Sequence, residues 1–473
     1  MTSIRFALDS IDDDVLVYIF SFLRPVDILS LRKTCRRLLA ISKLRIVWTN
    51  ACSTYILQKG YPFPSQSPDS LSVSELEQQT CHAFDLSSRW ISGFTAPRRT
   101  LFIDATASTR VSQVRFVPGH AGDWILTVSK GIWDVLTVWD ISGHPKKCCE
   151  WSPRGAIFSG ISLNTDISSE ATVAVSVLKD GNHTVEIMSL GVRADGSCSF
   201  LPIISLESFL KPIHLEGELL ALSDDVSQTV IWDWRHGTAA ILQHPPDETG
   251  SLPHDKCIQV IFAHLSILVV RARSIHLFPW PELTPTPKTY EPIQRHSFGW
   301  IDGVSVTKRK SGLTILLRGE SDDPWSSGLH SLDFYTLEPN LNSQNPSPYT
   351  FPPTLVTRVP AVRGSLRCRD VFLGPCGTAV WVQPQDRAPV GLVAGMDDYP
   401  LQAISTTSVH ESLVIAVFPG PLAPSDVSGN GAVTRSRTLC TNSLNNWTSL
   451  DYDEDLGRIA LSSSFGRVMI LEI

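Results

Sequence analysis

Residues 219–242 read LLALSDDVSQTVIWDWRHGTAAIL, a stretch in which apolar and β-branched runs are separated by two short polar turns. The first turn is rich in aspartate, and the second contains Arg235, His236 and Gly237. Short runs of this kind, bounded by turn-forming residues, are typical of β-strands. The stretch therefore predicts three antiparallel strands joined by short connections.

The same pattern recurs on both sides of this stretch. Residues 171–178, ATVAVSVL, and 183–190, HTVEIMSL, each alternate with a period of two around a Lys-Asp-Gly-Asn turn. This combination predicts a β-hairpin. Residues 124–151 and 458–473 show the same succession of strands and polar turns. We expect an all-β region that begins near Arg99 and continues to the end of the sequence.

One internal strand of each unit can be aligned, and the first spacings between the aligned residues are 48, 45 and 46 residues. A repeat of this length predicts the four-stranded blades of a β-propeller. The later spacings of 56, 59 and 77 residues predict insertions around Pro339–Pro360 and Pro419–Arg437. We predict about seven blades, with six as the alternative. The aligned residues are Trp139, Ile187, Trp232, Phe278, Phe334, Val393 and Ile470.

Two of these units resemble the blades of WD-repeat proteins. The tripeptides Val-Trp-Asp at 138–140 and Ile-Trp-Asp at 231–233 carry the resemblance, and Gly119-His120 is a weak match to the Gly-His dipeptide of that family. The resemblance implies a propeller and leaves its ligand open. Because an open ring would expose strand edges, we expect Leu101–Ala105 to pair beside Arg467–Glu472 and close the last blade.

The front of the sequence has a different period. Residues 11–38 read IDDDVLVYIFSFLRPVDILSLRKTCRRL. Ser10 can cap a helix that has three aspartates in its first turn, and the apolar residues that follow recur at helical spacing. Arg24-Pro25 ends this helix, Asp27 can cap a second one, and a third short helix is expected over 38–44. We expect three short helices within residues 5–50.

This front unit has more apolar surface than three short helices can bury together. The surplus either packs on the rest of the chain or binds a partner. Here the sequence resembles the F-box motif, although Asp12 stands where that family usually has proline and Leu38 where it usually has a large aromatic residue. The residues compared with the motif are Ile11, Asp12, Asp14, Val15, Leu16, Ile19, Phe20, Ser21, Phe22, Leu23, Pro25, Asp27, Ile28, Leu29, Leu31, Cys35 and Arg36.

Residues 51–98 form a connector between the two regions. Trp48, Tyr55 and Leu57 indicate continued helix, residues 60–70 are rich in Pro and Ser, and residues 73–84 predict one more helix. If these helices pack on the following domain, they fix its orientation, and otherwise they form a tether. The predicted fold class is therefore multidomain. It combines an α-helical front at 5–50, a partly helical connector at 51–98 and an all-β propeller at 99–473.

Composition excludes several classes of function. The chain has 473 residues, 42% of them hydrophobic, a formal net charge of −7 and a pI near 6.0, so it has no general field for nucleic acid or anionic membranes. A local basic run is a solvated helix face or, as the alternative, part of a helix-turn-helix DNA reader. Its members are Arg32, Lys33, Arg36, Arg37, Lys43 and Arg45.

The sequence also gives expectations about the compartment. The N-terminus lacks the apolar core of a signal peptide, and the most apolar later run, Ile258–Val270, is too short to span a bilayer. Ten cysteines show no paired CxxC spacing, and the adjacent Cys148-Cys149 can rarely bridge itself. We expect an intracellular protein, cytoplasmic or nuclear, with reduced thiols.

Signatures of catalysis are lacking. The sequence has no Walker loop, HExxH motif or GxSxG elbow, and we predict no catalytic residue, cofactor or metal. We expect the histidines at 214, 236, 264 and 276 to have hydrogen-bonded structural roles. Trp139 and Trp232 are expected in the core, whereas Trp300, Trp325 and Trp447 lie near predicted turns and can reach a binding face.

An F-box-like front joined to a propeller-like body is similar to the substrate receptors of cullin-RING ubiquitin ligases. The resemblance implies that the front helices dock a Skp-family adaptor, and through it a cullin, while the propeller holds a target protein. The implied adaptor-binding residues are Ile11, Val15, Leu16, Phe20, Pro25, Ile28, Leu29, Leu31 and Leu38, some of which alternatively form the internal core of the front unit. The rivals are a propeller scaffold that is not coupled to ubiquitination and a propeller enzyme.

Overall fold

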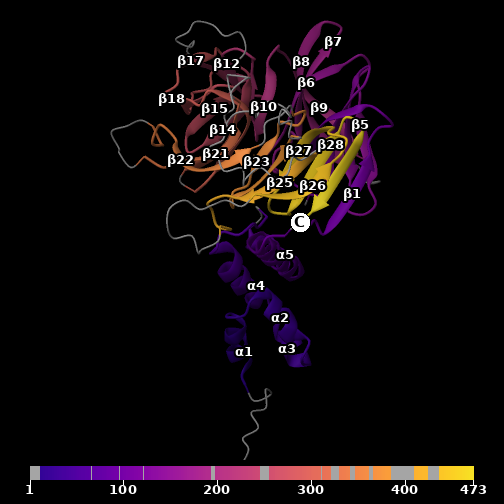
Figure 1. The fold of residues 1–473 in the computed structure, drawn as a ribbon, viewed down its shortest axis with the longest axis vertical. Helices are drawn as coiled ribbons and strands as arrows, with labels where there is room; N and C mark the ends of the chain where they lie inside the picture. Colours follow the sequence, from indigo (N-terminus) through magenta and orange to yellow (C-terminus); the bar gives the residue numbers. More distant parts are fainter. Residues whose placement is uncertain are drawn as a thin grey trace, which may run out of the picture.

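Seven small β-sheets stand in a ring, and a group of helices extends from one end of it (Figure 1). In Figure 1 the helices, in indigo, lie below the ring, and the yellow C-terminal strands lie beside the purple β1. The computed structural model describes residues 11–64, 67–94, 96–120, 122–192, 198–244, 255–310, 312–320, 330–340, 347–361, 366–384, 410–423 and 436–473.

The helices occupy the first part of the described chain. Four short α-helices precede a single π-helical turn, a 3₁₀ turn and one long helix. Their bounds are α1 Asp13–Phe20, α2 Pro25–Arg32, α3 Arg36–Ile41, α4 Arg45–Cys52, η2 Ser53–Leu57, η3 Pro68–Ser70 and α5 Val73–Ser92.

Each of the first four blades has four strands in chain order, and neighbouring strands are antiparallel. One extra strand, β17, adds to blade 3 by pairing parallel with β13. Blade 1 contains β2 Arg110–Phe116, β3 Trp124–Lys130, β4 Asp134–Asp140 and β5 Lys146–Trp151, and blade 2 contains β6 Ile157–Leu163, β7 Val173–Lys179, β8 Asn182–Val192 and β9 Cys198–Glu207. Blade 3 contains β10 Lys211–Glu216, β11 Leu219–Ser223, β12 Gln228–Asp233, β13 Thr238–Gln243 and β17 Lys288–Tyr290, and blade 4 contains β14 Cys257–Ala263, β15 Ser266–Arg271, β16 Ser274–Pro279 and β18 Gln294–Ser297.

The last three blades follow the same plan. Blade 5 contains β19 Trp300–Lys308, β20 Leu313–Glu320, β21 His330–Leu337 and β22 Thr354–Ala361. Blade 6 contains β23 Val371–Leu373, β24 Thr378–Gln383, β25 Glu411–Val417 and β26 Arg437–Asn442. Blade 7 contains β27 Trp447–Asp453, β28 Arg458–Ser463, β29 Arg467–Glu472 and, from the start of the domain, β1 Arg99–Asp104. The count of seven blades is thereby settled.

The closing strand confirms the sequence-based prediction. β1 pairs antiparallel with β29, from Arg99 opposite Glu472 to Asp104 opposite Arg467. The amide of Arg98 extends the ladder by donating to the carbonyl of Glu472 at 2.7 Å. This pairing covers the edge of β29, so the ring is joined by backbone hydrogen bonds between the two ends of the propeller.

The repeat alignment located the third strand of the blades. Six of the seven aligned residues lie on these strands, on β4, β8, β12, β16, β21 and β29. The seventh, Val393, lies outside the described residues, and the third strand of its blade is β25. The predicted insertion at Pro339–Pro360 is partly wrong, because β22 begins at Thr354 inside it. The paired backbone of β22 completes blade 5 despite its proline content.

The predicted helix starts need three corrections. Ser10 lies outside the described residues, and the N-cap of α1 is Asp12. Asp27 is in the first turn of α2 instead of capping it, since Pro25 takes the first helical position, where its missing N–H costs nothing. The third helix begins at Arg36, capped by the Cys35 sulfur, and not at Leu38.

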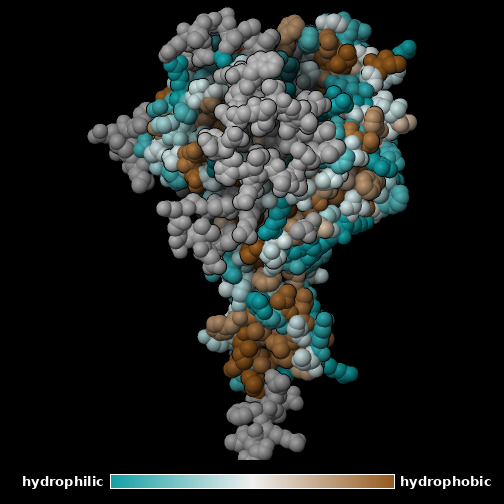
Figure 2. Space-filling view, viewed as in Figure 1, coloured by the Kyte–Doolittle hydropathy of each residue, from teal (hydrophilic) through white to brown (hydrophobic). Residues whose placement is uncertain are grey.

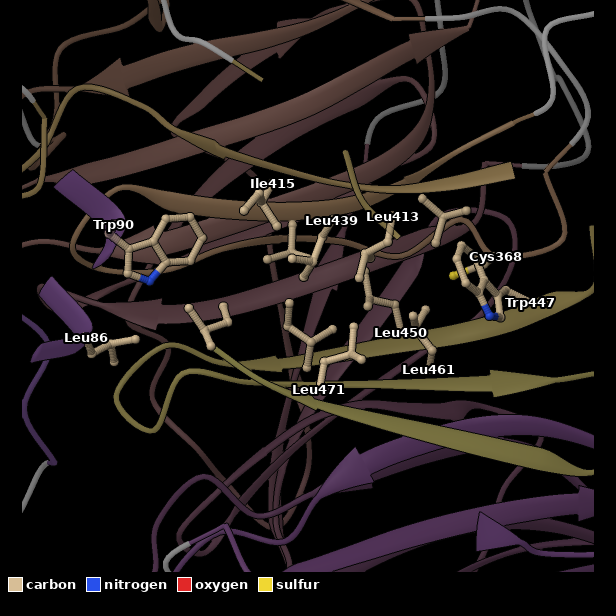
Figure 3. Close-up of a cluster of buried hydrophobic side chains, with 14 of the residues drawn as sticks. Leu86, Trp90, Cys368, Leu413, Ile415, Leu439, Trp447, Leu450, Leu461 and Leu471 are labelled. Carbon is tan, nitrogen blue, oxygen red and sulfur yellow. The ribbon is translucent and has the colours of Figure 1, made fainter. Parts of the chain in front are cut away.

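The connector is helical and is packed on both of its neighbours. α5 continues to Ser92, eight residues past the predicted end, and begins with a capping box formed by Ser72 and Glu75. Its first half contributes Leu76 to the core of the front helices. Its second half contributes Leu86 and Trp90 to a cluster of propeller side chains, as Figure 3 shows. One rigid helix thus belongs to both cores, and the alternative of a flexible tether is wrong for this segment.

In the described part of the chain, no helix has the length and apolar character needed to cross a membrane.

Candidate adaptor-binding site

The front helices pack around a small core of their own. Leu16 and Phe20 of α1, Ile28 of α2 and Leu38 of α3 are buried, together with Trp48 of α4. The indole N–H of Trp48 donates to the carbonyl of Ser42 at 2.8 Å, so this large ring is buried without an unpaired polar atom. The core leaves the remaining apolar residues of α1 on the outside.

Those residues form a second apolar stripe. Tyr18 and Ile19 stand three and four residues after Val15, and Phe22 stands four residues after Tyr18, the spacing of one helix face. Their exposed fractions are 48%, 66%, 42% and 64%, and Val26 of α2 is also exposed. The rings of Tyr18 and Phe22 meet edge to face with centroids 5.0 Å apart. We call these five residues the α1 surface.

The α1 surface lies at the end of the molecule that is far from the propeller. Figure 2 shows apolar side chains, in brown, gathered on the helical end below the ring. Large exposed apolar areas of this kind are uncommon on a protein surface and mark sites of interaction. The surplus that the sequence predicted is therefore not buried against the propeller.

Polar contacts hold the backbone that presents this surface. The guanidinium of Arg37 on α3 donates to the Asp13 carboxylate at 3.0 Å and also contacts the carbonyl of Ile11. The hydroxyl of Tyr55 donates to the carbonyl of Phe22 at 2.6 Å. These contacts fix both ends of α1 to neighbouring helices, so the exposed side chains stand on a preorganised support.

α2 is anchored to the connector by an ion pair. Arg32 donates to both carboxylate oxygens of Glu77 on α5, at 2.6 and 2.8 Å. The carboxylate raises the pKa of the Arg32 guanidinium by hydrogen bonding to its charged form. Because the pair is bidentate and partly shielded from solvent, it fixes orientation better than a single contact would.

Half of the basic run makes contacts inside the protein. Arg32 pairs with Glu77, Arg37 pairs with Asp13, and Arg45 donates to the carbonyls of Leu71 and Pro68. Three of the six cations therefore have structural partners. This arrangement supports the interpretation as a helix face over that of a DNA reader.

The predicted adaptor-binding residues fall into three groups. Leu16, Phe20, Pro25, Ile28 and Leu38 are buried, Ile11, Leu29 and Leu31 are half-buried, and Val15 is exposed. Tyr18, Ile19, Phe22 and Val26, which are more exposed than most of that set, were missing from the prediction. The signal that could have found them is the second stripe in α1, whose members stand at positions 15, 18, 19 and 22.

The propeller residues singled out by sequence also have definite places. All four histidines accept or donate hydrogen bonds, which confirms their expected structural role: His214 with Glu216, His236 with Asp233, His264 with Tyr349 and His276 with Ser274. Trp232 is buried and Trp139 is half-buried. Trp447 is buried too, so the expectation that it reaches a binding face is wrong, whereas Trp325 lies outside the described residues.

One group of side chains in the described residues has the spacing of metal ligands. Glu218, Asp233 and His236 bring their ligand atoms within 4.8 Å of one another at a surface turn of blade 3. Arg235 already neutralises part of this charge, with its Nε 2.9 Å from a Glu218 oxygen. We assign no metal to this exposed group.

Comparison with known proteins gives a family match for the front helices. A family model described as F-box-like matches residues 13–54. No curated protein matches the chain. Among solved structures, one chain in the crystal structure of a mitotic checkpoint complex is similar over 80% of this chain and 92% of that chain, at 10% identity and a TM-score of 0.46.

The match at residues 13–54 spans α1 to α4, which carry the α1 surface. The seven sheets and the closure by β1 define the body of the protein independently of any comparison. The chain therefore carries an F-box-like domain followed by a seven-bladed β-propeller.

Proposed function

We propose that this protein is the substrate-recognition subunit of a Skp-cullin-F-box ubiquitin ligase. The F-box-like match at residues 13–54 supports the class, because such domains joined to propellers are typical of adaptor or receptor proteins without catalysis. The front helices dock a Skp-family adaptor, and through it a cullin, while the propeller binds a target protein. The protein works inside the cell, in the cytoplasm or nucleus.

The observation that carries the proposal is the α1 surface. α1 has one apolar face buried in the core and a second apolar face exposed at the free end of the molecule. Burying that face against an adaptor would remove apolar area from water at about 25 cal/mol per Å². We propose that the adaptor directly contacts the α1 surface: Val15, Tyr18, Ile19, Phe22 and Val26. The buried residues Leu16, Phe20, Pro25, Ile28 and Leu38 support this surface from inside the helical core. Ile11, Leu29 and Leu31 lie at the margin.

The rigid connector gives the proposal a mechanism. α5 is part of both hydrophobic cores, so a target on the propeller is held at a fixed distance from the adaptor. Holding two reactants together raises their effective concentration, which is the only contribution that a non-catalytic receptor makes to ubiquitin transfer. No catalytic residue of this chain is required.

The proposal is tested by purifying the full chain from cells that contain the adaptor and cullin. The Tyr18→Asp/Phe22→Asp variant should lose both proteins, while Leu444→Asp, which changes an exposed leucine of the propeller, should retain them. Equal recovery from both variants would refute the α1 surface as the adaptor site. Recovery of the adaptor without the cullin, and unchanged turnover of bound partners, would favour the scaffold function.

A further inference from the structure

The two ends of the propeller face different surroundings. Connections between the first and second strands of blades 6 and 7 touch the helices: Cys376 contacts the carbonyl of Gly60 at 3.3 Å, and Leu86 packs on Gly457. Because strands alternate in direction, turns between second and third strands, and connections between blades, lie at the opposite end. This distal end is free of helices in the described part of the chain.

Four of the apolar side chains exposed at the distal end lie in blades 7, 1 and 2. Ile132 and Trp133 form the turn between β3 and β4, Phe465 is in the turn between β28 and β29, and Ile157 begins β6. Ile132 is 92% exposed and Phe465 is 61% exposed. Such bulky side chains at the tips of loops have no role in the core of the blades.

These turns are joined into one area by hydrogen bonds and contacts. The amide of Ala105 donates to the carbonyl of Gly466 at 2.9 Å, and the Thr109 methyl group lies beside Gly131. On the other side, the amide of Phe158 donates to the Asp134 carboxylate at 2.7 Å. The three blades therefore present their exposed side chains on a continuous support.

The charged side chains at this area have both signs, and two of the cations have no carboxylate partner. Arg110 begins β2 and Arg154 precedes β6, both are exposed, and neither makes an ion pair with any described residue. Two carboxylates at this area are already paired, Asp134 with Lys130 and Asp104 with Arg467, both at 3.1 Å. Asp180, in the turn between β7 and β8, stands next to Lys179 in sequence. The two unpaired arginines favour an acidic ligand, whereas a symmetric contact with a second copy of the chain would bring the same arginines against each other. We call Ile132, Trp133, Ile157, Phe465, Arg110 and Arg154 the distal patch.

We propose that the distal patch binds an acidic segment of a target protein that also carries bulky apolar side chains. The arginines pair with carboxylates of the segment, and Ile132, Trp133 and Phe465 bury its apolar residues. This inference rests on the proposed function, since it names the chemistry of the target. It commits to carboxylate-bearing peptides, and phosphopeptides or nucleic acid are outcomes that would overturn it.

The test uses the full chain and a library of random twelve-residue peptides displayed on phage. We expect the selected peptides to be enriched in Asp and Glu together with Leu, Phe or Trp. The best peptide, labelled with fluorescein, should bind the Arg110→Glu/Arg154→Glu variant about tenfold more weakly, because two attractive charges become repulsive. Ile132→Asp should weaken it similarly. A matched peptide with every acid changed to its amide should also lose binding.

Two control variants use the same chemistry at the opposite end of the ring. Leu265→Asp changes an exposed leucine between β14 and β15, and Lys146→Glu reverses an exposed cation at the start of β5. Both should bind the peptide as the natural chain does. The proposal would be overturned if no peptide is selected or if the selected peptides show no acidic bias. It would also be overturned if the arginine variant binds the peptide as well as the natural chain, or if the chain binds only phosphoserine peptides or oligonucleotides.

The experiment separates the two hypotheses. Tyr18→Asp/Phe22→Asp should bind the peptide normally while losing the adaptor, and Ile132→Asp should do the reverse. If the chain binds the adaptor but no acidic peptide, the proposed role of the distal patch is wrong and the receptor function stands. If the chain binds the peptide but not the adaptor, the protein recognises acidic segments without being part of a ubiquitin ligase.

Discussion

The amide of Phe116 donates to the carboxylate of Asp451 at 2.6 Å and so joins the first strand of blade 1 to the first strand of blade 7. Beside this bond, Arg115 donates to the carbonyl of Leu450 at 2.7 Å. The contact lies where the two ends of the propeller meet, in addition to the pairing of β1 with β29. Ring closure therefore depends on a buried carboxylate as well as on a backbone ladder.

The protonation of this carboxylate should affect stability. Burial raises the pKa of Asp451 to about 6 from 3.8, although Arg115 and the Phe116 amide oppose the change. A raised pKa means that the folded state holds the proton more tightly than the unfolded chain. The stabilising contribution is therefore complete below pH 3.8 and is lost as the pH rises through 6, a difference of about 3 kcal/mol.

Asp451→Asn should remove this part of the pH dependence, because the amide does not titrate. Denaturant unfolding at pH 4 and pH 7 measures the effect. The natural chain should lose about 2 kcal/mol more than the variant over this interval, because part of the unfolded aspartate is already ionised at pH 4. Asp180→Asn, in an exposed turn of blade 2, is the control and should behave as the natural chain. Parallel pH profiles for all three proteins would contradict the prediction.

The contact between α5 and the propeller should control the position of the front helices. Leu86 is buried against Gly457, and Leu86→Ala should cost about 2–5 kcal/mol through the cavity that it leaves. Small-angle scattering should then show a wider range of distances between the two domains. Ile91→Ala, on an exposed side of the same helix, should change neither quantity. Unchanged scattering from the Leu86 variant would show that other contacts hold the domains together.

The closing strand provides a matched pair of substitutions. Ile103 is buried and its neighbour Phe102 is half exposed, as expected from the alternation of side chains along β1. Ile103→Asp places an unpaired charge in the core and should lower the unfolding free energy by more than about 3 kcal/mol. Phe102→Asp should cost less than half as much. Thermal unfolding of the two variants compares them, and similar melting temperatures would argue against β1 as a structural part of blade 7.

The propeller was accessible from sequence because its hairpins are local. Trp139, Ile187 and Trp232 could be aligned since each belongs to a strand pair whose turn is only a few residues long. Trp447 was misplaced because its proximity to a predicted turn says nothing about the blade that packs over it. The distal patch could not be predicted either, because Ile132 and Phe465 are far apart in sequence and only ring closure makes their blades neighbours.

The front helices show the same limit on a smaller scale. A helix that is apolar on two sides reveals a surplus of apolar residues, but the sequence does not state which side faces the core. Leu16 and Val15 are adjacent in sequence and equally apolar, yet one is buried and the other is exposed. That choice depends on where α3 and α4 pack, which the pattern of α1 alone does not contain.

This difference between neighbours yields the sharpest test of the adaptor site. Leu16→Ala should destabilise the front helices by about 2–5 kcal/mol and weaken adaptor binding only through unfolding. Val15→Asp together with Tyr18→Asp should change stability by less than about 1 kcal/mol, because both side chains are exposed, and still abolish binding. Stability is measured by hydrogen exchange of the α1 amides, and binding by titration with purified adaptor. If the Leu16 variant loses binding while α1 keeps its protection, or the double variant binds normally, then the adaptor contacts the buried face of α1 and the helices must rearrange on binding.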